Sequence, residues 1–284
     1  MNFLPDKYKF LMLDRVLMWH NPCPAILVLR KDANNMVRIL MCGCNGKMGQ
    51  VITRIARYRE DVKIVGGFDI NDTLPNDYPV FKQLDQCDVN ADVMIDFSHP
   101  AALSRVLSYA ISKKIPLVVA TTGISDEQIN KIKEASHHIP VLFSANMSLG
   151  VNLLLELVQK AAKLLYSNFD IEIVERHHNQ KIDAPSGTAL ALADAINQSL
   201  PGKYRYVYDR HTKRVKRSKD EIGIHAIRGG NIAGDHTVIF AGNDEIIELR
   251  HMANSKEIFG VGALKAAGFL HDKAPGFYSM QDLF

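Results

Sequence analysis

Residues 37–49 of the chain have the sequence VRILMCGCNGKMG. A β-rich run leads directly into Gly43, Gly46 and Gly49, and apolar residues with helical spacing follow over 47–59. Glycines in such a corner let a diphosphate approach the backbone, and the N-terminus of the helix attracts its negative charge. The order strand, glycines, helix predicts the first unit of a dinucleotide-binding fold, although the GxxGxxG spacing leaves a plain strand–turn–helix corner as the alternative.

A carboxylate follows the second predicted strand. Asp69 stands 20 residues after the last of these glycines, where a Rossmann unit places the acid that accepts hydrogen bonds from the adenine ribose. Ile70 follows it, so no neighbouring arginine is available for a 2′-phosphate, and Asp69 and Asp72 would repel one. The segment therefore favours NADH over NADPH, with Lys47 in the glycine loop as a possible phosphate partner.

Short apolar runs then alternate with helical patterns as far as residue 146. One helix is expected to open at Pro100, and another is expected to be capped by Ser125, with Gln128 three residues later. This alternation predicts right-handed βαβ units and an α/β fold, a Rossmann-type doubly wound parallel sheet. The predicted strands are Val37–Gly43, Val62–Phe68, Asp92–Phe97, Pro116–Ala120 and Pro140–Ser144, and the first helix is Lys47–Arg59.

The pattern changes after Asn146. An alternating strand lies between two helices, and three further strands are joined by turns with the sequences GGN and GND. Such turns predict a meander, and hence a second α+β domain built on a mostly antiparallel sheet. The predicted helices are Leu149–Tyr166, Thr188–Ser199 and, near the end of the chain, Ser255–Leu270; the predicted strands are Asp170–Glu175, Ile222–Arg228, His236–Ala241 and Glu245–Met252.

Composition excludes several classes of protein. With 47% hydrophobic and 23% charged residues the chain is expected to be soluble and globular, and its net charge of +3 does not call for nucleic acid. The basic run Lys213–Lys219 has no interleaved aromatic residue, so a solvated loop is expected there. The four cysteines form no CxxC pair and no zinc spacing, which predicts reduced thiols, no metal site and a cytoplasmic location. No apolar run reaches about 18 residues, so no membrane span is expected.

Residues 172–190, EIVERHHNQKIDAPSGTAL, carry the groups that a reduction needs. His177 can donate a proton near neutral pH, and Lys181 can anchor a carboxylate. The backbone amides of Gly187 and Thr188 would lie at the start of the next helix and form an anion site. The alternatives are a solvated strand end and a metal site, but adjacent histidines on a strand point to opposite faces, and no Cys or acidic partner stands at ligand spacing. The segment predicts a small carboxylate substrate reduced by hydride from the first domain.

The same segment carries a resemblance to a known family. Residues 175–189 match the motif E-x-H-H-x-x-K-x-D-A-P-S-G-T-A at every fixed position. Over Met36–Phe284 the chain resembles the 4-hydroxy-tetrahydrodipicolinate reductases, or dihydrodipicolinate reductases, of bacterial lysine biosynthesis. The resemblance implies that His177 donates the proton and that Lys181 assists it. It also implies that the substrate carboxylates are bound by His178, Gly187 and Thr188.

The resemblance further implies a cofactor site and an assembly. A Rossmann-type domain over 36–146, completed by 255–284, would bind the dinucleotide, and 147–254 would form a substrate-binding and tetramerisation domain at the centre of a homotetramer. Residues 1–35 fall outside the resemblance, as a packed appendage or an over-long start of the chain. The implied contacts of NADH or NADPH are Gly43, Cys44, Asn45, Gly46, Lys47, Met48, Asp69, Ala120, Thr121, Thr122, Ser144, Ala145, Asn146 and Met147, with Cys44 and Asn45 where the family often has Ala-Gly.

The implied reaction is the reduction of dihydrodipicolinate, formed from 4-hydroxy-tetrahydrodipicolinate, to tetrahydrodipicolinate in diaminopimelate and lysine biosynthesis. Two alternatives stay open: another two-domain oxidoreductase, such as an amino-acid or sugar dehydrogenase, and a non-catalytic NAD-binding sensor. No cysteine follows Cys87 to serve an aldehyde-oxidising enzyme, and a sensor needs no proton donor beside an anion site. The outward face of the sheet from Asp170–Glu175 and Ile222–Met252 is expected to be too apolar to face water, which also favours a homotetramer.

Overall fold

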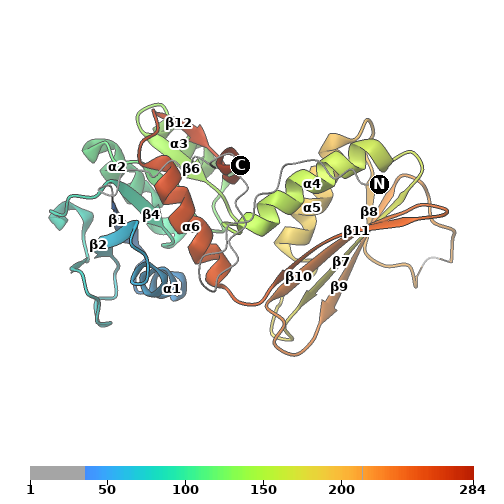
Figure 1. The fold of residues 1–284 in the computed structure, drawn as a ribbon, viewed down its shortest axis with the longest axis horizontal. Coiled ribbons are helices and arrows are strands. Elements are labelled where there is room, and N and C mark those ends of the chain that lie inside the picture. The colour runs from blue at the N-terminus through green and yellow to red at the C-terminus, as the bar shows by residue number, and fades with distance from the viewer. Residues whose placement is uncertain (1–35, 213) are drawn as a thin grey trace, which may run out of the picture. The chain divides into compact units, whose positions relative to one another are not determined.

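The structure, a computed structural model, describes residues 36–212 and 214–284. The predicted extension over residues 1–35 and the first residue of the basic run, Lys213, lie outside the described residues. Within them the chain forms one sheet of seven strands and one of five, each covered by helices (Figure 1). None of the described helices has the length and apolar character needed to cross a bilayer.

The first sheet is parallel throughout, with the strand order β12-β6-β5-β4-β1-β2-β3. It confirms the doubly wound parallel sheet that the sequence predicted. The two short edge strands, β3 and β12, were not predicted, because two or three residues are too few to show an alternating pattern. The strands are β1 (Val37–Cys42), β2 (Val62–Phe68), β3 (Val80–Phe81), β4 (Val93–Asp96), β5 (Leu117–Val119), β6 (Pro140–Phe143) and β12 (Gly276–Tyr278).

Helices cover both faces of this sheet, which explains why its strands are almost continuously apolar. Ile39 and Met41 of β1 pack with α1 and α6, whereas Leu40 and Cys42 pack on the other face with α2 and α3. The predicted capping box of α3 is confirmed, since Ser125 and Gln128 bond each other's backbone amides. The helices are α1 (Lys47–Ala56), α2 (Leu103–Lys113), α3 (Asp126–Ala135) and α6 (Glu257–Leu270), with 3₁₀ turns at Leu84–Gln86, Pro100–Ala102 and Met280–Leu283.

The second sheet has the strand order β11-β10-β7-β9-β8. Strand β10 is antiparallel to β7 and β11, whereas β7 and β8 are both parallel to β9. The expected meander is therefore wrong between β9 and β10, and the sheet is mixed rather than mostly antiparallel. The strands are β7 (Asp170–His177), β8 (Arg205–Val207), β9 (Glu221–Arg228), β10 (Gly234–Ala241) and β11 (Ile246–Ala253).

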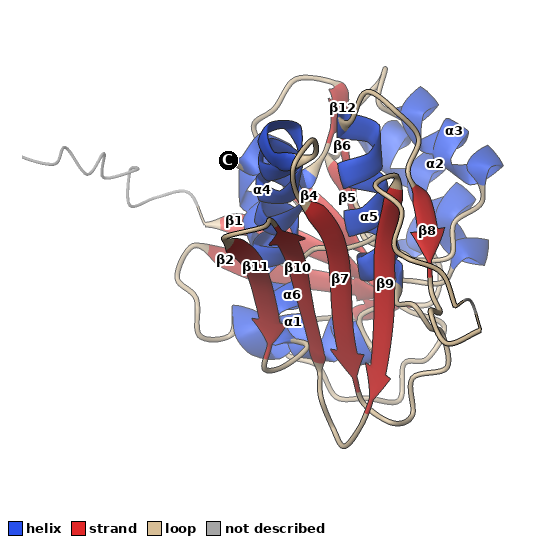
Figure 2. Ribbon diagram, turned by 90° about the vertical axis from the view of Figure 1, so that its right-hand side faces the viewer, coloured by secondary structure: helices blue, strands red, loops and turns tan. Residues whose placement is uncertain are grey.

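The central place of β7 has a packing reason. Ile173 of β7 is fully buried and pairs with Val238 of β10 on one side and with Ile224 of β9 on the other. These side chains lie under α4 (Leu149–Leu165) and α5 (Gly187–Ser199), which cover one face of the sheet (Figure 2). The inserted strand therefore has apolar neighbours on both sides, and burying this row under the helices stabilises the observed order.

The uncovered face of the second sheet differs from the apolar surface that the sequence led us to expect. Glu172 is paired there with Arg210, Arg217 and His225, and Asp235 is paired with Arg176 and Arg250. Apolar side chains alternate with these charges, the exposed ones being Ile227, Ile246 and Met252. The argument that this face is too apolar to meet water is therefore wrong, although it still carries exposed apolar groups.

Candidate active site

The glycine corner between β1 and α1 has room for a ligand at its middle glycine. Gly43 has φ of +77°, and a Cβ there would lie 2.6 Å from the carbonyl oxygen of Phe97. A Cβ on Gly49 would lie 2.2 Å from the carbonyl oxygen of Gly43, so these two glycines serve the packing of the corner itself. Gly46 is exposed, and a Cβ added to it would contact only the carbonyl oxygen of Gly43, at 3.3 Å. No side chain caps α1, so its first-turn amides can receive a diphosphate.

Asp69 holds this corner to the end of β2. Its Oδ2 accepts a hydrogen bond from the amide of Asn45 over 2.9 Å, and its Oδ1 accepts from the amide of Asn71 over 3.0 Å. Each carboxylate oxygen can accept a second bond, so ribose hydroxyls can still bind there. Ile70 is 80% exposed beside it, and the side-chain oxygen of Asn45 is occupied by Asn76 over 2.8 Å.

Two of the predicted cofactor residues turn their side chains into the core. The Cys44 thiol is fully buried against Gly67, and burial raises its pKa to about 12. Met147 is also buried, and its carbonyl oxygen lies against Gly262. Only the backbone of these two residues can reach a cofactor. Lys47, in contrast, is exposed at the start of α1.

The segment after β5 is tied to the end of β4. Thr121 is buried and donates a hydrogen bond from Oγ1 to Oδ2 of Asp96 over 2.9 Å. Asp96 is fully buried, which raises its pKa, and its Oδ1 accepts from the amide of Ser98 over 3.0 Å. Ala120 is buried with Thr121, whereas the side chain of Thr122 is exposed and accessible to a ligand.

The segment after β6 reaches the second sheet. Ser144 Oγ donates to the carbonyl oxygen of Asn146 over 2.8 Å, and Asn146 Oδ1 accepts from the amide of Ser148 over 3.0 Å. Asn146 Nδ2 then donates to Oγ1 of Thr188 over 3.2 Å. Ala145 is exposed between them. The structure thus joins a predicted cofactor residue directly to a predicted substrate residue.

His177 is the last residue of β7 and is 8% exposed. Its Nδ1 lies 2.6 Å from Oε2 of Glu175, which is fully buried. Glu175 also accepts two hydrogen bonds of 2.7 Å from Arg228 and one of 3.0 Å from the amide of Ser186. Burial raises the pKa of Glu175, but the hydrogen bonds from Arg228 and His177 outweigh burial, and the pKa is lowered overall.

The remaining predicted substrate residues follow in the turn and the next helix. The amide of Lys181 donates to the carbonyl oxygen of His178 over 3.1 Å, and its Nζ is paired with Asp183 at 2.7 Å. Helix α5 begins at Gly187, one residue earlier than predicted, and Ser186 caps it through the amide of Ala189. The amides of Gly187 and Thr188 have no partner among the described residues, as the anion site requires.

Sequence reasoning gave no role to four residues beside His177: Glu175, Ser186, Arg228 and His236. His236 is buried, its Nε2 lies 3.0 Å from Ser186 Oγ, and its ring centroid lies 5.1 Å from that of His177. Burial, with repulsion from His177, lowers the pKa of His236 to about 4. The two-residue period of a strand was the available signal for Glu175, because it places residues 175 and 177 on one face.

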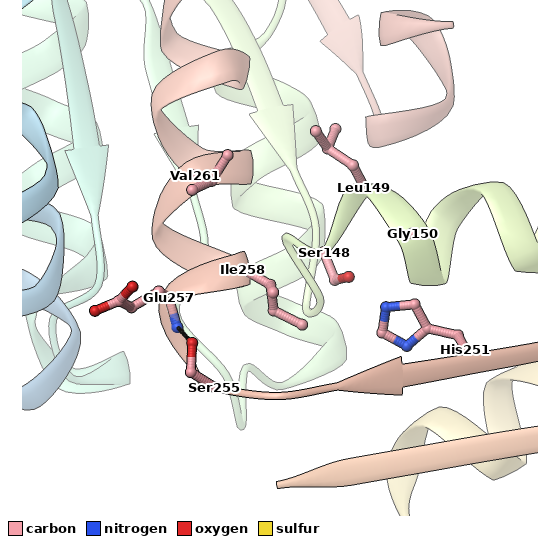
Figure 3. A pocket seen from close by; sticks show the side chains of 8 residues that line it. All are labelled: Ser148, Leu149, Gly150, His251, Ser255, Glu257, Ile258 and Val261. Atoms are coloured by element: carbon pink, nitrogen blue, oxygen red, sulfur yellow. Dashed lines mark hydrogen bonds between the residues drawn. The ribbon is translucent and has the colours of Figure 1, made fainter. Parts of the chain in front are cut away.

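A cavity of about 360 Å³ lies where the chain passes from the first sheet to the second and back (Figure 3). The ring of His251 points toward Ser148 and Gly150 at the start of α4, so close that a Cβ on Gly150 would lie 2.6 Å from it. None of the predicted site residues lines this cavity. The cavity lining is Ser148, Leu149, Gly150, His251, Ser255, Glu257, Ile258 and Val261.

Among the described residues no cluster of three His, Cys, Asp or Glu side chains could hold a metal.

Fold and site together define a two-domain, dinucleotide-dependent reductase. The chain belongs to the dihydrodipicolinate reductase family: the family's N-terminal model matches residues 37–147, and its C-terminal model matches residues 150–284. It is 54% identical over 248 residues to the 4-hydroxy-tetrahydrodipicolinate reductase of Caldanaerobacter subterraneus, covering 87% of this chain and 98% of that protein. The protein of the same name from Clostridium tetani is 52% identical over 245 residues, covering 86% and 96%.

A solved structure agrees with the sequence relatives. The dipicolinate-bound dihydrodipicolinate reductase of a Paenisporosarcina species has a TM-score of 0.76 and 25% sequence identity. The match covers 88% of this chain and 100% of that one. Residues 1–35 precede both family models.

Proposed function

We propose that this protein is an NAD(P)H-dependent reductase that converts dihydrodipicolinate, formed from 4-hydroxy-tetrahydrodipicolinate, to tetrahydrodipicolinate in lysine and diaminopimelate biosynthesis. One observation carries the proposal: Glu175 accepts hydrogen bonds from both His177 and the amide of Ser186. That shared carboxylate fixes a proton donor beside the N-terminus of α5, where a carboxylate substrate can bind. Family membership of the chain supports the choice of substrate.

The two halves of the chain have separate tasks in this proposal. Residues 36–146, with 255–284, bind the dinucleotide, and 147–254 bind the substrate. Gly46 and the first-turn amides of α1 would hold the diphosphate, and Asp69 would accept hydrogen bonds from the adenine ribose. The exposed Thr122 and the Ser144–Met147 segment hold the nicotinamide end, with Cys44 and Met147 contributing backbone groups alone.

On the substrate side, the free amides of Gly187 and Thr188, the Thr188 hydroxyl and His178 bind the two carboxylates. A dihydronicotinamide bound there would supply a hydride, while His177 supplies a proton from its Nε2. The ring thus gains two electrons and two hydrogens while the cofactor is oxidised. Lys181 holds negative charge near the ring and is itself kept in place by Asp183.

We propose that the protein prefers NADH to NADPH. Ile70 is exposed where an arginine would hold a 2′-phosphate, and Asp69 and Asp72 repel that phosphate. Lys47, exposed in the glycine loop, is the alternative partner for such a phosphate. We also place the protein in the cytoplasm as a homotetramer, with no nucleic acid or membrane partner.

The test is NADH oxidation with and without 4-hydroxy-tetrahydrodipicolinate, the product of the synthase reaction that precedes this one. The protein should oxidise NADH only when that product is present, and His177→Gln should lower kcat by roughly 10²–10⁴ because a general acid is lost. The affinity for NADH should hardly change in that variant. A protein that binds NADH but never oxidises it on this substrate would be a sensor or another dehydrogenase.

A further inference from the structure

Glu175 makes more polar contacts than a packing role requires. Its two oxygens receive two bonds from Arg228, one from Ser186 and one from His177, and the side chain is fully buried. A carboxylate with this environment is ionised at any working pH, because Arg228 and the other donors outweigh the cost of burial and lower its pKa. An ionised carboxylate can only accept hydrogen bonds.

We infer that Glu175, kept ionised by Arg228, is the positioning residue that decides which nitrogen of His177 donates the proton. The inference rests on the proposed function, in which His177 is the donor. Because Glu175 can only accept, the neutral imidazole must carry its hydrogen on Nδ1. Nε2 is then the atom that takes up the second proton and gives it to the substrate. Arg228 prevents that proton from moving to Glu175 instead.

The surroundings of Nε2 fit this assignment. A Cβ on Gly234 of β10 would lie 3.2 Å from Nε2, tighter than an ordinary contact, so a glycine at this position avoids crowding the ring at Nε2. Nε2 has no hydrogen-bond partner in the described part of the chain, whereas Nδ1 is occupied by Glu175. The ring can therefore meet a substrate only through Nε2.

The charges around His177 come from three strands. Glu175 lies on β7, Arg228 on β9, and His236 on β10. Burial lowers the pKa of His236 to about 4, so that histidine stays neutral at working pH and does not compete for the proton. Among the described residues Glu175 is thus the one negative group that bonds His177, and removing its charge must make the protonated ring less favourable.

Glu175→Gln is the decisive variant. It should lower kcat by at least about tenfold, and by no more than the roughly 10²–10⁴-fold that a general acid contributes. The Kd for NADH should not change. The limb of the kcat profile that falls as pH rises should move to lower pH, because the protonated ring has lost its anionic partner. Glu175→Asp keeps the charge, so its limb should return toward the wild-type position even if kcat stays reduced.

Asp235→Asn is the matched control. Asp235 is also nearly buried and ion-paired with two arginines, but it lies on the opposite face of the same sheet. Asp235→Asn should lower Tm as Glu175→Gln does. It should change kcat by no more than about twofold, and the falling limb of its pH profile should stay at the wild-type position. A shift of kcat and pH limb equal to that of Glu175→Gln would overturn the inference, since any lost ion pair would then produce it.

A measurement on the wild type does not depend on whether a variant folds. Nitrogen-15 NMR of labelled histidine should show the neutral His177 ring protonated at Nδ1. Predominant Nε2 protonation would overturn the inference, as would wild-type kcat and pH profile in Glu175→Gln while His177→Gln is inactive. Full activity in His177→Gln would instead remove the proposed donor itself, and the inference with it.

Discussion

The side-chain amide of Asn146 donates a hydrogen bond from Nδ2 to the hydroxyl of Thr188 over 3.2 Å, across 42 residues of chain. Asn146 follows β6 of the parallel sheet, and Thr188 lies in the first turn of α5 on the second sheet. Hydride transfer needs its two carbon atoms within about 3–3.5 Å, so the end of one sheet must be held against the other. This bond is a direct polar link of that kind between the two proposed binding segments.

Thr188→Val tests the proposed carboxylate site. The change keeps the volume but removes the hydroxyl from both Asn146 and the substrate. Losing a hydrogen bond to a charged group should raise the KM for the dicarboxylate roughly tenfold to a hundredfold, with a smaller effect on the KM for NADH. Steady-state kinetics with each substrate varied in turn measures both. Thr188→Ser keeps the hydroxyl and should stay close to the wild type, and an unchanged KM in Thr188→Val would remove the residue from the site.

Lys181→Ala tests whether the lysine acts on the substrate or merely pairs with Asp183. If Lys181 holds charge near the ring, kcat should fall and the KM for the dicarboxylate should rise, each by roughly tenfold, because anchoring in the ground state is lost too. Lys160→Ala removes a similar lysine–carboxylate pair, with Glu156 on α4, and should leave both constants unchanged. Near-wild-type kinetics in both variants would make Lys181 a surface residue.

The sequence predicted what depends on neighbouring residues. The start of α3 follows from Ser125 and Gln128, whose side chains bond each other's backbone amides. Strand β2 follows from the β-rich run Val62–Phe68. Likewise His177, Lys181 and Thr188 lie close along the chain and could be found together from their motif.

What the sequence could not supply is pairing between distant segments. Strands β9 and β10 follow one another with a short turn, yet β7 lies between them, because the packing under α4 and α5 decides the order. Local alternation carries no information on partners. The same limit hid Arg228, which lies 53 residues from Glu175 along the chain. It also left the charges on the uncovered face of the second sheet unrecognised, since single polar residues in a strand do not reveal their partners.

Ile70→Arg tests the cofactor preference. The wild-type kcat/KM for NADH should equal or exceed that for NADPH, because the loop after Asp69 offers no arginine. An arginine at position 70 can form charged hydrogen bonds to the 2′-phosphate, so kcat/KM for NADPH should rise by roughly tenfold. Tyr58→Arg adds the same charge at an exposed site at the end of α1 and should leave the cofactor ratio unchanged. A wild-type enzyme with a strong preference for NADPH would point to Lys47 as the phosphate partner.

Assembly can be tested on the uncovered face of the second sheet. Met252 is 56% exposed there beside the Asp235–Arg250 pair, and Ile227 is exposed as well. If this face meets other subunits, light scattering at micromolar concentration should report a tetramer, and Met252→Glu should split it without loss of secondary structure. Leu164→Asp, on the exposed side of α4, is the control and should remain tetrameric. A wild-type monomer under these conditions would contradict the assembly.

Acid should destabilise the protein through His236. The ordinary pKa of a histidine is 6.5, and burial lowers that of His236 to about 4 in the folded protein. Between these values the unfolded chain takes up a proton that the folded protein does not, so the free energy of unfolding must fall as pH falls through this window. At pH 5 the loss from this one residue is about 2 kcal/mol, whereas at pH 7 it is close to zero.

The measurement is denaturant unfolding at pH 7 and pH 5, at one fixed protein concentration. His236→Gln should be less stable than the wild type at pH 7, because a buried ring is replaced, but it should lose about 2 kcal/mol less on going to pH 5. The pKa of His251 is also lowered by burial, and its contribution is present in both proteins, so it cancels in the comparison. His138→Gln, at an exposed position, should keep the wild-type loss. An equal loss in the wild type and His236→Gln would mean that His236 binds its proton as readily in the folded protein as in the unfolded chain, and it would then compete with His177 for the proton.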